Sequence, residues 1–201
     1  MHPNPIFRKS PQDRDIAFAQ QRSFGVLAMN ADPVPLVSHI PFQLSDDGKH
    51  VEAHLVRSNP ILKLLETPQV AKLIVSGGDC YVSPDWYGVE DQVPTSNYIA
   101  VHLTGVLKRL PQADMRGILD RLSAGMEGRI DGKTPWKIAK MTPEVYDRME
   151  RQIVPIAFEV TEITSTWKLS QNKPDAVKAA AKVGIAENPL GVEVKGLVDE
   201  M

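Results

Sequence analysis

The sequence predicts an α+β fold, with a mainly antiparallel sheet curled into a small barrel. Several short segments alternate apolar and polar residues with a period of two, which is typical of half-buried strands. The helical patterns are few and lie between or after these strands. The 16 prolines among 201 residues also favour many short elements joined by turns over a helical bundle.

The N-terminal half is expected to hold two helices and three strands. Ser10 as N-cap, followed by Pro11 at the first helical position, is typical of a helix start. Val51, Ala53 and Leu55 alternate with less apolar residues, as on a half-buried strand. The expected elements are a helix over residues 10–22, strands over 24–29, 36–42 and 51–56, and a helix that begins after Asn59.

The C-terminal half is expected to alternate longer strands with helices. The strand pattern over 70–75 is interrupted by Gly77 and Gly78, and the polar and aromatic segment after it is long enough for a functional loop. The expected elements are strands over 70–75, 80–83, 97–110 and 153–170, and helices over 112–127, 142–149 and from about 174 to 186. The last residues carry no clear pattern.

Composition limits the function classes. The 23 Lys and Arg residues are balanced by 25 Asp and Glu, so no global positive field attracts nucleic acid. The single cysteine, Cys80, excludes a disulfide framework within one chain and a cysteine-based zinc module, and it indicates a cytoplasmic protein. No apolar run approaches the roughly 20 residues of a membrane span, and the first ten residues lack the apolar stretch of a signal peptide.

Common catalytic and cofactor motifs are missing from the sequence. It contains neither the GxGxxG dinucleotide fingerprint nor the GxSxG nucleophile elbow. Residues 128–134, GRIDGKT, are one residue short of a phosphate loop. His50 and His54 lie on a predicted strand, where four residues span roughly 13 Å, so they do not share a metal ion. We therefore expect no metal site.

Two segments are candidates for ligand binding. At HLVRSNP, residues 54–60, a strand is expected to pass into a helix beside Arg57 and Ser58, which would suit a phosphate. The alternative there is a capped helix with a solvated arginine, because capping alone explains Ser58 and Asn59.

The second candidate is aromatic. Trp86, Tyr87 and Trp167 have aromatic rings that can stack on the planar ring of a ligand. The alternative is that these rings pack in the core or in loops. The side chains that would bond the edge of such a ring are Asn97, Gln171 and Asn172. For His39 and His102 the alternative to ligand binding is an internally hydrogen-bonded histidine.

Five motifs in order resemble one family, the PaiB-type FMN-binding negative transcriptional regulators. They are HIPF (39–42), AHLVRSNP (53–60), YVSPDWY (81–87), VPTSNY (93–98) and WKLSQN (167–172). The resemblance extends over about residues 1–190. It implies the FMN-binding split β-barrel, similar to pyridoxamine 5'-phosphate oxidase, and a homodimer with flavin at the subunit interface.

The resemblance also implies which residues hold the cofactor. Arg57, Ser58 and Asn59 match the region that binds the FMN phosphate, and the strand through His39 and Pro41 would run beside the isoalloxazine. The remaining candidates come from the neighbouring strand and from the motifs that would close the site, from the same or from the other subunit. They are His54, Asn97, Trp167, Lys168, Gln171 and Asn172. Two positions depart from the family pattern: Ser96 replaces a Trp, and His2 replaces a Tyr.

The expected protein is therefore a homodimeric flavoprotein, a transcriptional regulator or a flavin-dependent redox protein. Residues 1–173 would form the FMN-binding domain and residues 174–201 a helical extension. If it is catalytic, it would transfer hydride or electrons to a small acceptor, with His54 or His102 as candidate acid or base. Two alternatives remain open: a haem-binding or haem-degrading split barrel, and a repressor that binds DNA directly.

Overall fold

The computed structural model describes residues 1–201, which form two compact units. The first, here called the barrel unit, comprises Ile16–Ile74 and Leu103–Ile163. The second, here called the terminal unit, comprises Met1–Asp15, Val75–His102 and Thr164–Met201.

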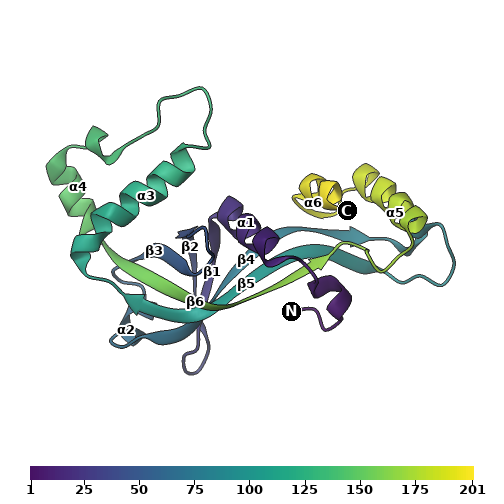
Figure 1. The fold of residues 1–201 in the computed structure, drawn as a ribbon, viewed down its shortest axis with the longest axis horizontal. Coiled ribbons are helices and arrows are strands. Elements are labelled where there is room, and N and C mark those ends of the chain that lie inside the picture. The colour runs from purple at the N-terminus through teal and green to yellow at the C-terminus, as the bar shows by residue number, and fades with distance from the viewer. The chain divides into compact units, whose positions relative to one another are not determined.

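Seven strands and six α-helices, with four short 3₁₀ helices, make up the chain (Figure 1). The strands are β1 (Phe24–Met29), β2 (Leu36–Leu44), β3 (His50–Val56), β4 (Gln69–Val82), β5 (Thr95–Arg109), β6 (Ile153–Lys168) and β7 (Gly191–Val192). The α-helices are α1 (Gln12–Arg22), α2 (Ile61–Leu64), α3 (Met115–Glu127), α4 (Pro143–Glu150), α5 (Asp175–Glu187) and α6 (Val194–Glu200). The 3₁₀ helices are η1 (Pro5–Arg8), η2 (Pro84–Tyr87), η3 (Gln112–Asp114) and η4 (Ile138–Lys140).

The barrel unit is a closed ring of six strands. The sheet order is β1-β2-β3-β6-β5-β4-β7, and an additional antiparallel pairing of β1 with β4 closes the ring. The alternation predicted for β3 holds, because Val51, Ala53 and Leu55 point into the buried interior. These findings confirm the α+β class and the small antiparallel barrel.

The outer surface of the ring is covered unevenly. α3 packs against β2 and β3, where Arg121 donates two hydrogen bonds, of 2.7 and 2.8 Å, to the carboxylate of Glu52. On β4, β1 and β2 the outward side chains include Val70, Phe24 and Val37, which are 69%, 52% and 56% exposed. These three exposed apolar side chains lie on neighbouring strands and are here called the apolar strip. Exposed apolar surface of this kind is typical of an interaction surface.

The terminal unit contains the remaining parts of β4, β5 and β6, with α5, α6 and β7 (Figure 1). α6 buries Val194, Leu197 and Val198. α5 lies against η2, where Gly184 lets Trp86 approach so closely that a Cβ there would stand 2.3 Å from the Trp86 ring. The C-terminal residues are thus a packed part of this unit.

The predicted interruption of the strand at Gly77 and Gly78 is wrong, because β4 continues from Gln69 to Val82. Gly78 does not break the strand but allows another segment of the chain to pack closely against it. A Cβ at Gly78 would lie 2.9 Å from the carbonyl oxygen of Glu193 and 3.0 Å from that of Val192. The glycine therefore makes room for the C-terminal segment, whose β7 pairs with β4.

The helix predicted after Asn59 is only one turn long, Ile61–Leu64. No helix of the chain is both long and apolar enough to cross a membrane.

Candidate functional site

Arg57 lies at the end of β3, where the chain leaves the barrel wall. Its backbone N–H donates a 2.7 Å hydrogen bond to the carbonyl of Gln152, which extends the pairing of β3 with β6. Its Nε donates to the carbonyl oxygen of Arg151 at 2.6 Å, and its Nη2 donates to Gln112 Oε1 at 2.8 Å and to the Ile153 carbonyl at 3.2 Å. The guanidinium is therefore held in a fixed orientation.

These bonds leave Arg57 able to bind an anion. A guanidinium has five N–H donors, of which these contacts use three. All three acceptors are uncharged oxygens, so they do not neutralise the positive charge. The side chain is exposed, and its two remaining donors lie on one nitrogen, Nη1. A pre-oriented arginine of this kind fits the phosphate of FMN.

The two residues that follow Arg57 differ in whether their side chains are available to bind a ligand. Asn59 is used internally, because its Oδ1 accepts from the Ile61 N–H at 3.0 Å and its Nδ2 donates to Ser38 Oγ at 3.0 Å. Ser58 is exposed. Since α2 has a single turn, its dipole contributes little, and the phosphate-binding capacity of this corner depends on Arg57 and Ser58.

His39, Pro41 and His54 point outward from the barrel. His39 is exposed on β2 beside Val26 of β1, and its ring stacks on Phe24 with centroids 6.4 Å apart. His54 of β3 lies opposite Pro155 of β6, and its Nδ1 is buried with no hydrogen-bond partner. Burial lowers the pKa of His54, so its imidazole is neutral at pH 7.

His54 is expected to make the fold sensitive to mild acid. Its pKa is lower in the folded chain than in the unfolded chain, so its contribution to stability is complete above pH 6.5 and is lost as the pH falls toward the folded pKa. The free energy of unfolding should decline below pH 6.5, no more steeply than about 1.4 kcal/mol per pH unit, the slope for one proton. Urea unfolding between pH 5 and 7 measures this.

His54→Leu should flatten that decline. A mutant with the same slope as the wild type would show that another group carries the acid sensitivity.

The other predicted site residues lie in the terminal unit. Asn97 is fully buried and exchanges hydrogen bonds with the Ser170 hydroxyl, at 3.0 and 3.3 Å. Lys168 donates to the hydroxyl of Thr95 and, at 2.7 Å, to the carbonyl of Ser96. Burial lowers the pKa of Lys168. Both motifs that contain these residues, VPTSNY and WKLSQN, thus meet in this unit.

The loop after β6 is internally bonded. Gln171 accepts from the Leu169 N–H at 2.7 Å and donates to the Trp167 carbonyl, which holds Ser170 in a left-handed conformation at φ 60°. Asn172 follows and is exposed.

The aromatic residues support the packing alternative. Trp167 is 4% exposed, its Nε1 donates to Asp15 Oδ1 at 2.7 Å, and the guanidinium carbon of Arg14 lies 3.8 Å from its ring centroid. Tyr87 is buried with Lys173 above its ring, and Trp86 packs on Gly184. The rings thus have protein partners. The sequence patterns did not identify the partners Asp15 and Gln112, because both are brought in from distant parts of the chain.

The predicted site residues therefore form two sets. The barrel unit holds His39, Pro41, His54, Arg57, Ser58 and Asn59, and the terminal unit holds Asn97, Trp167, Lys168, Gln171 and Asn172. Within each set the side chains are brought together by neighbouring strands or by the turns that follow them.

Comparison with known proteins gives a consistent result. Residues 1–162 match the family described as "Putative FMN-binding domain". The protease synthase and sporulation protein PAI 2 of Bacillus subtilis (strain 168) is 27% identical over 187 residues, which cover 91% of this chain and 89% of that protein.

Two solved structures show the same fold. The FAD and haem binding protein from Mycobacterium smegmatis superposes with a TM-score of 0.55 at 17% identity, covering 91% of this chain and 80% of that one. The flavocytochrome Anf3 from Azotobacter vinelandii gives 0.56 at 13% identity, with 83% and 72% covered. The family match spans most of the sequence, and the barrel is the architecture expected for it. The chain therefore belongs to this FMN-binding family and is a split-barrel protein of the PaiB type.

Proposed function

We propose that this protein binds FMN as a homodimer and holds the cofactor phosphate at Arg57. The observation that carries the proposal is the Arg57 guanidinium, which is fixed by three uncharged oxygens and keeps two N–H donors and its charge for a ligand. Ser58 would add a hydroxyl at the same corner. Asn59 would act indirectly, by shaping the turn through its bonds to Ile61 and Ser38.

The remaining candidates would surround the flavin ring. His39, Pro41 and His54 present one outward surface of β2 and β3, on which His54 is neutral because burial lowers its pKa. From the terminal unit, Lys168 would supply a cation and Asn172 a free amide, with Asn97, Trp167 and Gln171 supporting the loop that carries them. Residues 174–201 would serve as an extension to the FMN-binding domain of residues 1–173.

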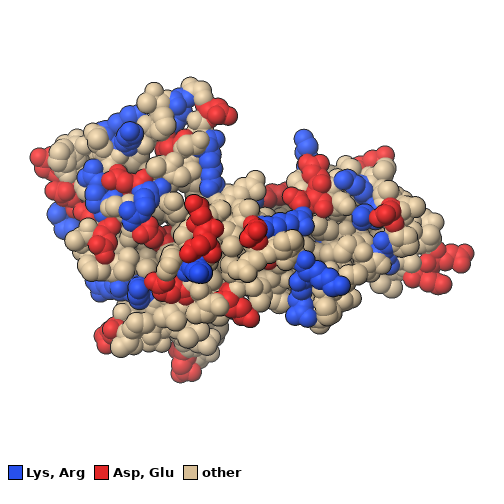
Figure 2. Space-filling model, in the orientation of Figure 1, with Lys and Arg blue, Asp and Glu red and all other residues tan.

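Bound FMN would supply transfer of hydride or electrons to a small acceptor. The protein's own contribution would be to bind and orient the cofactor and to tune its surroundings. A regulatory role, inferred from similarity to the PaiB type, would follow from ligand or redox state. Direct DNA binding has little support, because Lys and Arg alternate with Asp and Glu over the face in Figure 2.

The apolar strip of Phe24, Val37 and Val70 supports the homodimer, because an unpaired surface of this kind is rarely left in water. Val37→Lys is expected to convert a dimer of twice 22.2 kDa into a monomer, as measured by light scattering. Val183→Lys on α5 is the matched control, since Val183 is exposed to a similar extent, 57% against 56%, and lies outside the strip. A wild-type monomer, or equal behaviour of the two variants, would contradict this assignment.

The proposed function is tested by titrating the purified chain with FMN, riboflavin and haem while recording visible spectra. FMN should bind saturably and more tightly than riboflavin, because only FMN carries the phosphate that Arg57 contacts. Haem is the second candidate, since the similar Mycobacterium smegmatis protein binds FAD and haem. A Soret band from bound haem that is lost in His39→Ala or His54→Ala would favour haem. A folded chain that takes up no flavin would overturn the proposal.

A further inference from the structure

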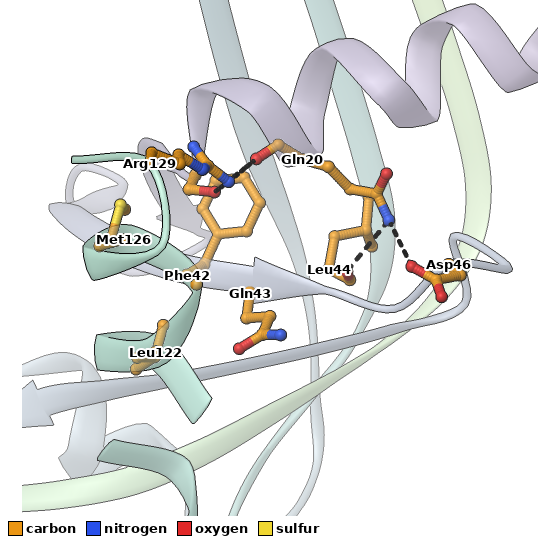
Figure 3. A pocket seen from close by; sticks show the side chains of 10 residues that line it. Gln20, Phe42, Gln43, Leu44, Asp46, Leu122, Met126 and Arg129 are labelled. Atoms are coloured by element: carbon orange, nitrogen blue, oxygen red, sulfur yellow. Dashed lines mark hydrogen bonds between the residues drawn. The ribbon is translucent and has the colours of Figure 1, made fainter. Parts of the chain in front are cut away.

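A cavity of about 210 Å³ lies between three elements of the barrel unit, and none of the residues proposed to hold flavin lines it (Figure 3). Its walls come from the last turn of α1, the end of β2 and the second half of α3. Phe42, Leu122 and Met126 give it an apolar side. A single water occupies about 30 Å³ of liquid, so the space is large enough for a small organic molecule.

One end of the cavity carries a fixed cation, Arg129. Its Nη1 donates to the Gln21 carbonyl at 2.6 Å, and its Nη2 donates to the Gln20 carbonyl at 2.8 Å and to Ser23 Oγ at 3.0 Å. These bonds cap the C-terminus of α1 and orient the guanidinium. Two of its five donors remain, and all three acceptors are uncharged. Arg129 can therefore receive a carboxylate.

Gln43 provides an acceptor that has no donor. Its Oε1 is buried without a hydrogen-bond partner. Its cross-strand neighbour Glu52 cannot satisfy it, because an ionised carboxylate has no hydrogen to donate. Gly125 of α3 faces this amide, and a Cβ there would lie 4.0 Å from Oε1. A ligand N–H at this point would satisfy the oxygen.

The other end of the cavity is anionic. Asp46 lies across the cavity from Arg129 in Figure 3, and its Oδ1 accepts from Gln20 Nε2 at 3.2 Å. Gln20 also donates to the carbonyls of Leu44 and Ser45, at 3.4 and 3.3 Å, so the acidic end is fixed to α1. The cavity thus has a positive end, a negative end and an apolar wall between them.

We propose that this cavity binds a small linear zwitterion, an ω-amino carboxylate of four to six carbons. Its carboxylate pairs with Arg129, its methylenes lie along Leu122 and Met126, and its ammonium donates to Gln43 Oε1 and Asp46. A molecule with a carboxylate alone would leave Gln43 Oε1 without a donor and the charge of Asp46 without a cation. An amine alone would leave Arg129 without an anion.

The test uses 5-aminopentanoate, pentanoate and pentylamine as probes, followed by NMR of the ¹⁵N-labelled full chain. The reporters are the Gly125 backbone amide and the Gln43 side-chain amide. We expect saturable shifts with 5-aminopentanoate in the micromolar to millimolar range, as suits about eight heavy atoms. The two singly charged probes should bind at least about tenfold more weakly, because each loses one charged hydrogen-bonded end.

Two variants test the location. Arg129→Gln should weaken 5-aminopentanoate at least about tenfold. Because Arg129 also caps α1, Gly125→Leu provides a second variant, which fills the cavity with a good helix former and should abolish binding. Ala124→Leu is its matched control, since Ala124 is an exposed neighbour on α3 that does not line the cavity and should leave binding unchanged.

Three results would overturn the proposal. They are the absence of saturable shifts up to about 10 mM probe, equal affinity for pentanoate or pentylamine, and shifts that persist in Gly125→Leu.

Discussion

Replacing Arg57 by glutamine is expected to raise the Kd for FMN about 10- to 100-fold and to leave the Kd for riboflavin nearly unchanged. Each hydrogen bond between a guanidinium and a phosphate contributes about 1.5–3 kcal/mol, and the variant removes the charge together with the two free donors of Nη1. Riboflavin has no phosphate, so its affinity reports only the ring contacts. Fluorescence titration of both flavins measures the difference.

Arg57 also holds the barrel together, since it bonds to the carbonyls of Arg151 and Ile153. A loss of about 1–2 kcal/mol in the free energy of unfolding is therefore expected in the same variant, and it should affect both flavins equally. Lys63→Gln is the control, because it removes an exposed positive charge from nearby α2. Equal weakening of FMN and riboflavin in Arg57→Gln would place the phosphate elsewhere.

Trp167→Ala is expected to reduce the free energy of unfolding by about 3–5 kcal/mol, the range for truncating a buried tryptophan. It also removes the 2.7 Å hydrogen bond to Asp15, which is itself only 4% exposed, and the surface on which Arg14 lies. A buried carboxylate left without its donor adds to the loss. Urea unfolding followed by far-ultraviolet circular dichroism measures the change.

Two milder variants separate packing from hydrogen bonding at this position. Trp167→Phe keeps most of the ring and loses only the indole N–H, so about 1–3 kcal/mol should be lost. Asp15→Asn keeps an oxygen acceptor for the indole and should cost less than Trp167→Phe. Loss of FMN binding in a Trp167→Ala variant that keeps its stability, with binding retained in Trp167→Phe, would instead indicate that Trp167 stacks on the flavin.

The barrel strands could be predicted from the sequence because alternation follows directly from which face is buried. The expected strand over 51–56 and the observed β3, His50–Val56, differ by one residue, and β1 agrees at both ends. β4 was harder to predict. In the sequence, Gly77 and Gly78 indicate that the strand is interrupted. In the structure, Gly78 makes room for backbone oxygens of residues more than 100 positions later. Only the folded chain places them together.

The elements at the C-terminus could not be predicted from the sequence for a related reason. β7 has two residues and α6 has seven, so neither provides enough sequence for a periodic pattern. Both are stabilised by contacts within the terminal unit: β7 pairs with Asp79 and Cys80 of β4, and α6 buries Val194, Leu197 and Val198. Local propensity contributes little to such elements.

The candidate site was partly predictable in the same sense. The motif HLVRSNP predicted a corner at Arg57, but it did not show which groups bond to the Arg57 side chain. The structure shows that Asn59 serves mainly as a cap and that Gln112 and the start of β6 hold Arg57. For Trp167, the decisive partner is Asp15, 152 positions away. Partners at such distances follow from topology, which residue spacing does not encode.

The ³¹P NMR spectrum of the protein with one equivalent of FMN tests the central claim most directly. If Arg57 holds the phosphate, the bound resonance should be shifted from that of free FMN. The bound phosphate should also remain a dianion at pH values where the phosphate of free FMN is protonated to the monoanion, near pH 6. In Arg57→Gln the resonance should return toward that of free FMN. A flavin that is bound by its visible spectrum, while its phosphate titrates as in free solution, would contradict the account.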